Sequence, residues 1–260
     1  MPASLRTGWL PPDGSLHGPQ LDRLLESNLA VLLALLLLAQ LLLLYGVLRS
    51  RRGVDAAHPA VEARTSAWRT ETLPLLLCCL LFAAMAISSQ RLWAALRYQG
   101  PAPGAMQVEA VGVQFQWYFR YPGPDGRFGF VRPALVNAAA GNPLGLDPND
   151  RRSGDDIVSS VLVLPAGREV DLRLRAHDVI HGFFIPGMRL KQNAVPGLLL
   201  HVHFTPVVGG TYPILCTQVC GSGHARMQAV LHVVPPGEFA TWLAGRERAL
   251  TPAAEEGARQ

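Results

Sequence analysis

Apolar residues are concentrated in two long segments of the first hundred residues. Residues 28–48 and 72–90 contain no charged side chain. Because the hydrocarbon core of a bilayer is about 30 Å thick and needs about 20 helical residues to cross, Leu29–Leu48 predicts one membrane-spanning helix. Leu73–Ser89, continued through Leu96, predicts a second. We therefore expect the chain to be embedded in a lipid bilayer.

The segment between the predicted spans sets their orientation. Residues 49–71 hold five arginines against three acidic residues, and short loops rich in Lys and Arg stay on the cytoplasmic side. We therefore expect a cytoplasmic loop, with both termini and the domain after residue 99 on the periplasmic or equivalent outer side. The 27 residues before the first span carry only Arg6 and Arg23 as basic residues, and they do not resemble the basic end of a signal peptide.

A period of two dominates the sequence after residue 99 and predicts β-strands. Pro and Gly turns separate the alternating runs and no long stretch follows a helical period, so we expect an antiparallel sandwich or barrel. Residues 122–156, rich in Gly, Pro, Asn and Asp, form a long excursion after the first run. The residues beyond Thr251 are expected to fray. The alternating runs are Val108–Tyr121, Val161–Leu164, Val170–Leu174, Leu198–Phe204 and Ala229–Val233.

Composition and charge exclude several classes of protein. Apolar residues make up 49% of the chain and the mean hydropathy is +0.20, which excludes disordered and collagen-like proteins. The formal charge is only +4 and no basic stripe indicates a nucleic-acid partner. The expected organisation is an outer N-terminal segment (1–27), a two-helix membrane anchor (28–98) with its cytoplasmic loop (49–71), a β domain (99–240) and a C-terminal tail (241–260).

The strongest chemical signal is a run of soft ligands after the predicted strands. Cys216, Cys220, His224 and Met227 follow a C-x3-C-x3-H-x2-M spacing, and thiolate, imidazole and thioether donors together favour copper. Zinc leaves the methionine unexplained. His181, at the end of a predicted strand, is the candidate for a further imidazole. A disulfide between the two cysteines is the alternative without a metal, but the neighbouring histidine and methionine favour the metal.

Two membrane spans before a β domain, the His181 segment and the Cys216–Met227 segment resemble subunit II of cytochrome c oxidase, in the haem-copper oxidase family. The resemblance also covers Gln114–Pro122, residues 142–148 and the turn at 191–197. It implies a transmembrane helical hairpin followed by an all-β, cupredoxin-like Greek-key sandwich that holds a dinuclear copper centre, copper A. In that family the centre accepts single electrons from cytochrome c. It passes them to haem in subunit I of a proton-translocating complex, which reduces oxygen to water.

The resemblance also implies a role for each ligand. It implies that the thiolates of Cys216 and Cys220 bridge both coppers, and that His181 and His224 supply one imidazole to each copper. Met227 would supply a weak thioether to one copper, and Gln218 its backbone carbonyl to the other. Such a centre only accepts and passes on electrons and forms no bond in a substrate, so the chain is expected to have no catalytic residue of its own. It would work with subunit I and a subunit III in a bacterial inner membrane.

Several positions depart from the family pattern. Gln218 stands where glutamate is common, and because a neutral amide binds hard cations poorly, we do not expect the family's magnesium site here. Phe115 replaces the tryptophan through which electrons enter beneath docked cytochrome c, and Trp117 matches the second family tryptophan; sheet packing is the alternative role for both. Asn193 replaces one docking carboxylate, whereas Asp178 is retained for partner docking. The donor could therefore be cytochrome c or another small electron carrier.

Three other assignments fit parts of this pattern. A nitric oxide reductase can have a copper-bearing small subunit, and a membrane-anchored copper-delivery protein can use C-x3-C on a thioredoxin-like fold. The β pattern and the paired spans argue against the delivery protein. A quinol-oxidising relative lacks the copper ligands that this chain retains.

The remaining candidate residues are expected to have other roles. We expect His177, His201 and His203 to be structural or solvated. Glu62 and Glu71 are expected to be interfacial carboxylates that could serve a proton path, and Cys78 and Cys79 to be small apolar residues within the second span.

Overall fold

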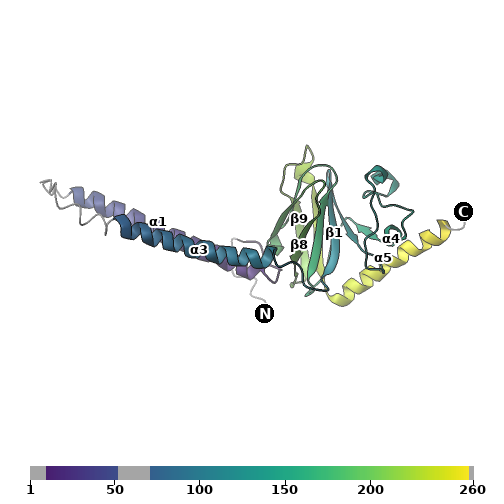
Figure 1. The fold of residues 1–260 in the computed structure, drawn as a ribbon, viewed down its shortest axis with the longest axis horizontal. Helices are drawn as coiled ribbons and strands as arrows, with labels where there is room; N and C mark the ends of the chain where they lie inside the picture. The colour runs from purple at the N-terminus through teal and green to yellow at the C-terminus, as the bar shows by residue number, and fades with distance from the viewer. Residues whose placement is uncertain (1–9, 52–70, 258–260) are drawn as a thin grey trace. The chain divides into compact units, whose positions relative to one another are not determined.

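The computed structural model describes residues 10–51 and 71–257 of the chain (Figure 1). They divide into two compact units. One contains residues 20–98, and the other joins residues 10–19 to the sequence from residue 99 onward. Residues 52–70, which hold Glu62 and most of the predicted cytoplasmic loop, lie outside the described residues.

Both predicted membrane helices are present. Helix α1 (Gly18–Arg51) and helix α3 (Leu73–Arg97) are long and apolar enough to cross a membrane. Pro74 lies in the first turn of α3, where its missing backbone donor costs little. Helix α1 begins about ten residues before its uncharged stretch, because the Ser15 hydroxyl accepts a hydrogen bond from the Gly18 N–H at 3.0 Å and satisfies one of the free donors at the helix start.

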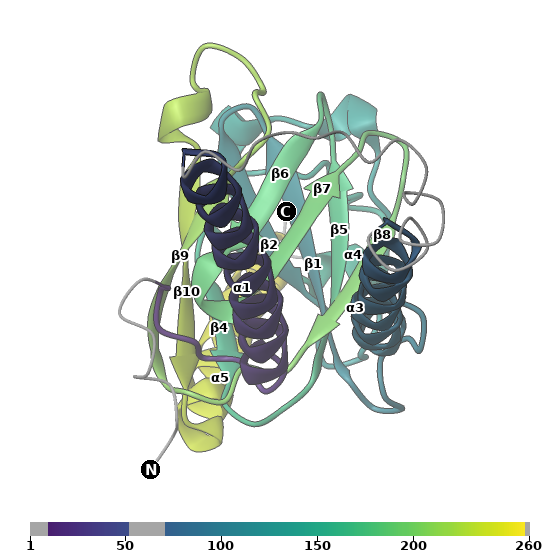
Figure 2. The ribbon, with the colours of Figure 1, turned by 90° about the vertical axis from the view of Figure 1, so that its left-hand side faces the viewer.

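The second unit is a sandwich of two five-stranded sheets, which can be followed in Figure 2. The first sheet has the strand order β3-β2-β1-β5-β8, and the second has the order β4-β10-β9-β6-β7. The strands are β1 (Met106–Val113), β2 (Gln116–Tyr121), β3 (Ile157–Ser159), β4 (Leu162–Pro165), β5 (Val170–Ala176), β6 (His181–Ile185), β7 (Leu190–Ala194), β8 (Leu200–Phe204), β9 (Gly210–Cys216) and β10 (Gln228–Val234).

The strand pairing confirms a sandwich but corrects two predictions. The run Val108–Tyr121 is a hairpin of β1 and β2, with Val113 opposite Gln116, rather than one strand. The alternation continues through both strands and neither turn residue is Gly or Pro, so the sequence pattern did not reveal the turn. The sheets are also not purely antiparallel, because β1 pairs in parallel with β5 and β4 with β10. A period of two reports burial on one face but carries no information about strand direction.

Aromatic side chains join the two sheets through a buried core. Phe119 of β2 and Phe183 of β6 meet edge to face with their ring centroids 6.4 Å apart. The buried Tyr121 hydroxyl donates to the Val163 carbonyl at 3.0 Å and accepts from the Val163 N–H at 2.7 Å. Each fully buried side chain of this size contributes about 1.5–3 kcal/mol, so these contacts hold the sheets face to face.

The residues expected to form a C-terminal tail are helical instead. Helix α5 (Pro236–Gly257) packs its first turns on the sandwich. Phe239 is buried, and Trp242 meets Tyr121 edge to face with ring centroids 5.1 Å apart. The helical period covers only these few apolar positions, so the sequence pattern gave no signal for the helix that these tertiary contacts stabilise.

A buried arginine tethers the excursion of residues 122–156 to the first sheet. Arg120, whose side chain is 1% exposed, pairs with Glu109 at 3.1 Å and contacts the Asp156 carboxylate. Its guanidinium also donates to the Gly129 carbonyl at 2.6 Å. Gly129, near the start of the excursion, and Asp156, at its end, are thereby held at one point, and its short helices lie between them: η2 (Pro133–Leu135), η3 (Ala138–Ala140) and α4 (Arg151–Gly154).

Asp156 gives this cluster a predicted pH dependence. Burial raises the pKa of the Asp156 carboxyl to about 6, against the opposing effect of Arg120, from an ordinary value of 3.8. The folded state therefore keeps this proton to higher pH than the unfolded chain, so its stability should fall as the pH rises from about 4 to about 6. Asp156→Asn should flatten the dependence in this window. Urea denaturation of the full chain in detergent at several pH values measures it, and an unchanged slope in the variant would contradict the assignment.

Candidate metal centre

The loop from Cys216 to Met227 connects β9 to β10 and is closed at its base. The Cys216 N–H donates to the Met227 carbonyl at 3.2 Å, and the 3-10 helix η5 (His224–Arg226) forms the return. At Gly223 an added Cβ would lie 2.4 Å from the Phe115 ring. Only glycine allows this approach, so the loop folds tightly against the β1–β2 turn.

The Cys220 sulfur lies at the centre of the loop's donor atoms. It is 3.8 Å from the Cys216 sulfur, 3.7 Å from Nδ1 of His224 and 3.8 Å from the Met227 sulfur. The Cys216 thiol in turn lies 3.3 Å from the backbone carbonyl of Gln218. Since a disulfide requires about 2.05 Å between sulfurs, both thiols are free, and the disulfide alternative does not describe this structure.

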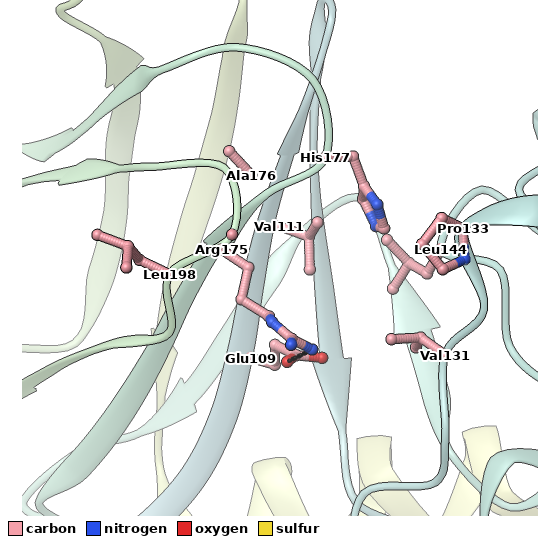
Figure 3. Close-up of a pocket in the computed structure, with 10 residues that line it drawn as sticks. Glu109, Val111, Val131, Pro133, Leu144, Arg175, Ala176, His177 and Leu198 are labelled. Atoms are coloured by element: carbon pink, nitrogen blue, oxygen red, sulfur yellow. Dashed lines mark hydrogen bonds and ion pairs between the residues drawn. The ribbon is translucent and has the colours of Figure 1, made fainter.

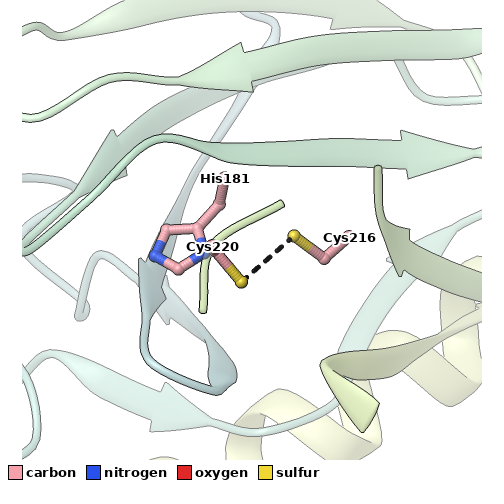
Figure 4. A group of neighbouring side chains, drawn as sticks. All are labelled: His181, Cys216 and Cys220. Carbon is pink, nitrogen blue, oxygen red and sulfur yellow. Dashed lines mark hydrogen bonds between the residues drawn. The ribbon is translucent and has the colours of Figure 1, made fainter. Parts of the chain in front are cut away.

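His181 completes the cluster from the other side. It is the first residue of β6, not the end of a strand as the sequence pattern predicted. It is fully buried and places a ring nitrogen within 4.8 Å of both sulfurs (Figure 4). Its Nε2 lies 2.8 Å from a carboxylate oxygen of Asp178, while its buried Nδ1 has no hydrogen-bond partner among the described residues. A carboxylate at Nε2 keeps the proton on that nitrogen. The Nδ1 lone pair is therefore available to a metal ion.

The electrostatics of the cluster also suit a cation. Burial raises the pKa of the Cys220 thiol to about 11, and the adjacent Cys216 adds to the shift. Although partial burial opposes it, hydrogen bonds from His181 and from two backbone N–H groups hold the pKa of Asp178 below its ordinary value. Two sulfurs at this distance, one of them buried, ionise together only when a positive ion neutralises them. The free thiols, the thioether and the unpartnered imidazole nitrogen fit a soft metal.

Comparison with known proteins identifies the domain that carries this cluster. Residues 106–234 match the family described as cytochrome c oxidase subunit II, periplasmic domain. This chain belongs to the cytochrome c oxidase subunit II family. The matched region contains both sheets and every donor of the cluster, so the donor cluster lies within the family's domain. With two helices able to cross a membrane, the chain is a membrane-anchored member with a periplasmic domain.

Relatives in this family match a little over half of the chain. The alternative cytochrome c oxidase subunit 2 of Bradyrhizobium diazoefficiens is 38% identical over 141 residues, which cover 54% of this chain and 50% of that protein. Cytochrome c oxidase subunit 2 of Thermostichus vulcanus is 35% identical over 144 residues, 55% of this chain and 34% of that protein. The chain thus spans half or less of these relatives. The crystal structure of the periplasmic domain of subunit II of cytochrome oxidase from Bradyrhizobium japonicum is 26% identical, with a TM-score of 0.42, and covers 57% of this chain and 98% of that domain.

The two aromatic residues that the subunit II resemblance linked to electron transfer occupy different environments. Phe115 is half-buried at the β1–β2 turn, where its ring faces Gly221 and Gly223 of the cysteine loop. Trp117 is fully buried and meets the His181 ring edge to face, with centroids 5.7 Å apart. A donor at the surface can therefore touch Phe115 but not Trp117.

Asp178, predicted to dock a partner, is occupied within the subunit II domain. Its carboxylate accepts hydrogen bonds from the Gln114 N–H at 2.6 Å and the Val179 N–H at 2.7 Å, in addition to its contact with His181. Its side chain is 26% exposed. Gln218 is exposed beside the cluster and contributes its backbone carbonyl there.

The other histidines that were considered lie elsewhere in the subunit II domain. His177 lines a cavity of about 330 Å³ between the first sheet and the excursion, beside the ion pair of Glu109 with Arg175 (Figure 3). His201 lies 3.0 Å from the carboxylate of the buried Asp171.

The remaining candidate residues belong to the unit of residues 20–98. Glu71 is exposed immediately before α3, and Cys78 and Cys79 are free and exposed on that helix.

Two contacts around the subunit II site were not identified from the sequence. The spacing of Asp178 three residues before His181 is a local signal for the carboxylate–imidazole contact, and it could have been found. Gln114 gives no such signal, because it donates its side-chain amide to the Cys220 carbonyl, 106 residues away in the sequence, at 2.5 Å. Only the folded chain brings these two groups together.

Proposed function

We propose that this chain is the subunit through which electrons enter a respiratory terminal oxidase. Its cysteine loop and His181 would hold a dinuclear copper centre, with the ligands Cys216, Cys220, His181, His224, Met227 and the Gln218 carbonyl. The observation that carries the proposal is the clustering of soft donors around the Cys220 sulfur, next to a buried imidazole nitrogen that has no other partner. Such a centre supplies reversible one-electron storage when it is bound.

The protein's part is to hold the donors still and keep water away. Cys220 is 4% exposed, Met227 is 1% exposed and His181 is fully buried. The ligands begin or follow strands of one sheet, and β6 pairs directly with β9 with Phe183 opposite Cys216. A rigid and dry ligand set moves little when its charge changes, which favours fast electron transfer at a small driving force.

The proposal extends to partners and location. Haem and oxygen chemistry would belong to subunit I, with a subunit III in the same complex, and cytochrome c or a similar small carrier would reduce this chain. Phe115, half-exposed against the cysteine loop, is the proposed point of electron transfer from the carrier. We place the copper domain and both termini on the outer side of a bacterial inner membrane, with the arginine-rich segment between the helices in the cytoplasm.

Copper loading of the full chain in detergent tests the metal assignment. We expect two coppers per chain, and an electron-paramagnetic-resonance spectrum in which one unpaired electron is shared equally between two copper nuclei. Metal analysis and the spectrum are recorded on the same sample. The paired variant Cys78→Ser, Cys79→Ser should retain both coppers, because these cysteines lie on α3 and outside the cluster.

A single copper per chain, or zinc retained in preference to copper, would contradict the dinuclear centre. One copper held by the two cysteines and one histidine would instead favour a copper-delivery protein. The identity of the partner is tested separately, by purifying the complex from its membrane. Haem and copper in an associated large subunit that reduces oxygen would support the oxidase, whereas reduction of nitric oxide alone would exclude it.

A further inference from the structure

Three separate parts of the chain converge at the metal cluster. They are the β1–β2 turn, the loop before β6 that ends at His181, and the cysteine loop between β9 and β10. The β1–β2 turn supplies no candidate ligand. It nevertheless contacts both of the other loops, and Gln114 makes both of the hydrogen bonds involved.

The side chain of Gln114 binds the cysteine loop. Its amide Nε2 donates to the backbone carbonyl of Cys220 at 2.5 Å, which fixes the peptide that carries the central sulfur. The neighbouring Phe115 ring packs against Gly221 and Gly223, the next glycines of the same loop. The side-chain amide is therefore the polar anchor of a contact that is otherwise apolar.

The backbone of Gln114 binds the histidine loop. Its N–H donates to one carboxylate oxygen of Asp178 at 2.6 Å, and the other oxygen lies 2.8 Å from Nε2 of His181. The carboxylate thus spans from the β1–β2 turn to the imidazole. Gln114 is therefore linked directly to the Cys220 main chain and, through Asp178, to the His181 ring.

We infer that Gln114 is a positioning residue of the metal centre, which sets the separation of the cysteine loop from the His181 ring by bonding to the loop directly and to the ring through Asp178. This inference rests on the proposed function for its spectroscopic consequences. It concerns a residue that touches no metal itself. Partners outside the ligand set orient the ligands of a metal site, and their loss commonly costs about 10- to 100-fold in metal affinity.

The test compares two glutamines of the same hairpin in the full chain in detergent. Gln114→Met keeps the length of the side chain and removes its donor, while the backbone bond to Asp178 remains. Gln116→Met is the matched control, because the Gln116 amide donates only weakly, at 3.4 Å, to the carbonyl of the adjacent Trp117. Both variants are loaded with copper, and copper loss to a chelator and the copper hyperfine couplings are measured.

We expect Gln114→Met to bind the same amount of copper as the unmodified chain, to lose it about tenfold faster and to show altered hyperfine couplings. Gln116→Met should match the unmodified chain. A variant that merely loosened the fold would lower the thermal midpoint of the copper-free protein without changing the couplings at full occupancy. Identical couplings and loss rates in Gln114→Met and the unmodified chain would overturn the inference.

A measurement on the copper-free chain separates this inference from the proposed function. Alkylation by iodoacetamide, resolved by peptide mass spectrometry, reports the accessibility of Cys220 without any metal. Gln114→Met should raise its rate about fivefold, the ratio that corresponds to one typical hydrogen bond, and Gln116→Met should not. If the unmodified chain binds no dinuclear copper, the proposed function fails, and the inference is then judged by the Cys220 alkylation rate alone. A higher rate in Gln114→Met supports the positioning role, and an unchanged rate overturns it.

Discussion

Under the proposed function, Cys220→Ser is expected to abolish the dinuclear centre and to slow electron transfer from a reduced carrier such as cytochrome c into the assembled oxidase by more than about 100-fold. The Cys220 sulfur lies within 4 Å of three other donor atoms, those of Cys216, His224 and Met227. A serine hydroxyl is a hard donor with a high pKa and cannot bridge two soft metal ions. Loss of an outer partner alone costs about 10- to 100-fold, so loss of the central ligand should exceed that.

Stopped-flow reduction of the haem in the complex measures this effect, together with copper content and the paramagnetic spectrum. Cys79→Ser is the matched control, a cysteine of the same chain on helix α3. Both variants should assemble in similar amounts, because Cys220 lies in a loop closed by backbone hydrogen bonds. A Cys220→Ser complex that retained two coppers and rapid haem reduction would exclude the assigned bridging role.

Arg120→Met should destabilise the β domain by about 3–5 kcal/mol. The guanidinium, 1% exposed, binds Glu109 and Asp156, whose side chains are 2% and 0% exposed. Removing a buried cation leaves carboxylates without compensation, and this costs about 3–5 kcal/mol in comparable cases. For a domain of this size the thermal midpoint should fall by about 10 °C. Thermal denaturation of the full chain in detergent, followed by near-ultraviolet circular dichroism, measures the shift.

Two further variants test the cause of this loss. Arg175→Met removes a guanidinium that is 40% exposed and bound to the same Glu109 at 3.3 Å, so it should cost about 1 kcal/mol or less. Adding Glu109→Gln and Asp156→Asn to Arg120→Met should recover much of the lost stability, because no uncompensated charge then remains. If the triple variant is no more stable than Arg120→Met, lost packing rather than unpaired charge explains the effect.

Local patterns in the sequence indicated the membrane helices, the runs that contain six of the ten strands in the described β domain, and the candidate donors of the loop. Leucine-rich stretches specify their helices because a bilayer requires a fixed length of apolar residues. The cysteine loop could be identified because four of its donors fall within twelve residues, so short-range geometry brings them together. The sequence also indicated His181 as a candidate donor, but only because the donors of the cysteine loop needed one more imidazole from elsewhere in the chain.

Tertiary structure decided the features that depend on residues far apart in the chain. The parallel pairing of β1 with β5, the docking of α5 through Trp242 and the contact of Gln114 with Cys220 each join segments distant in sequence. Burial of Arg120 likewise depends on the excursion folding back over it. Hydrophobic periodicity records which face of an element is buried but not which element covers it. The choice of partner, and with it the environment of the metal site, is made only when the two sheets pack together.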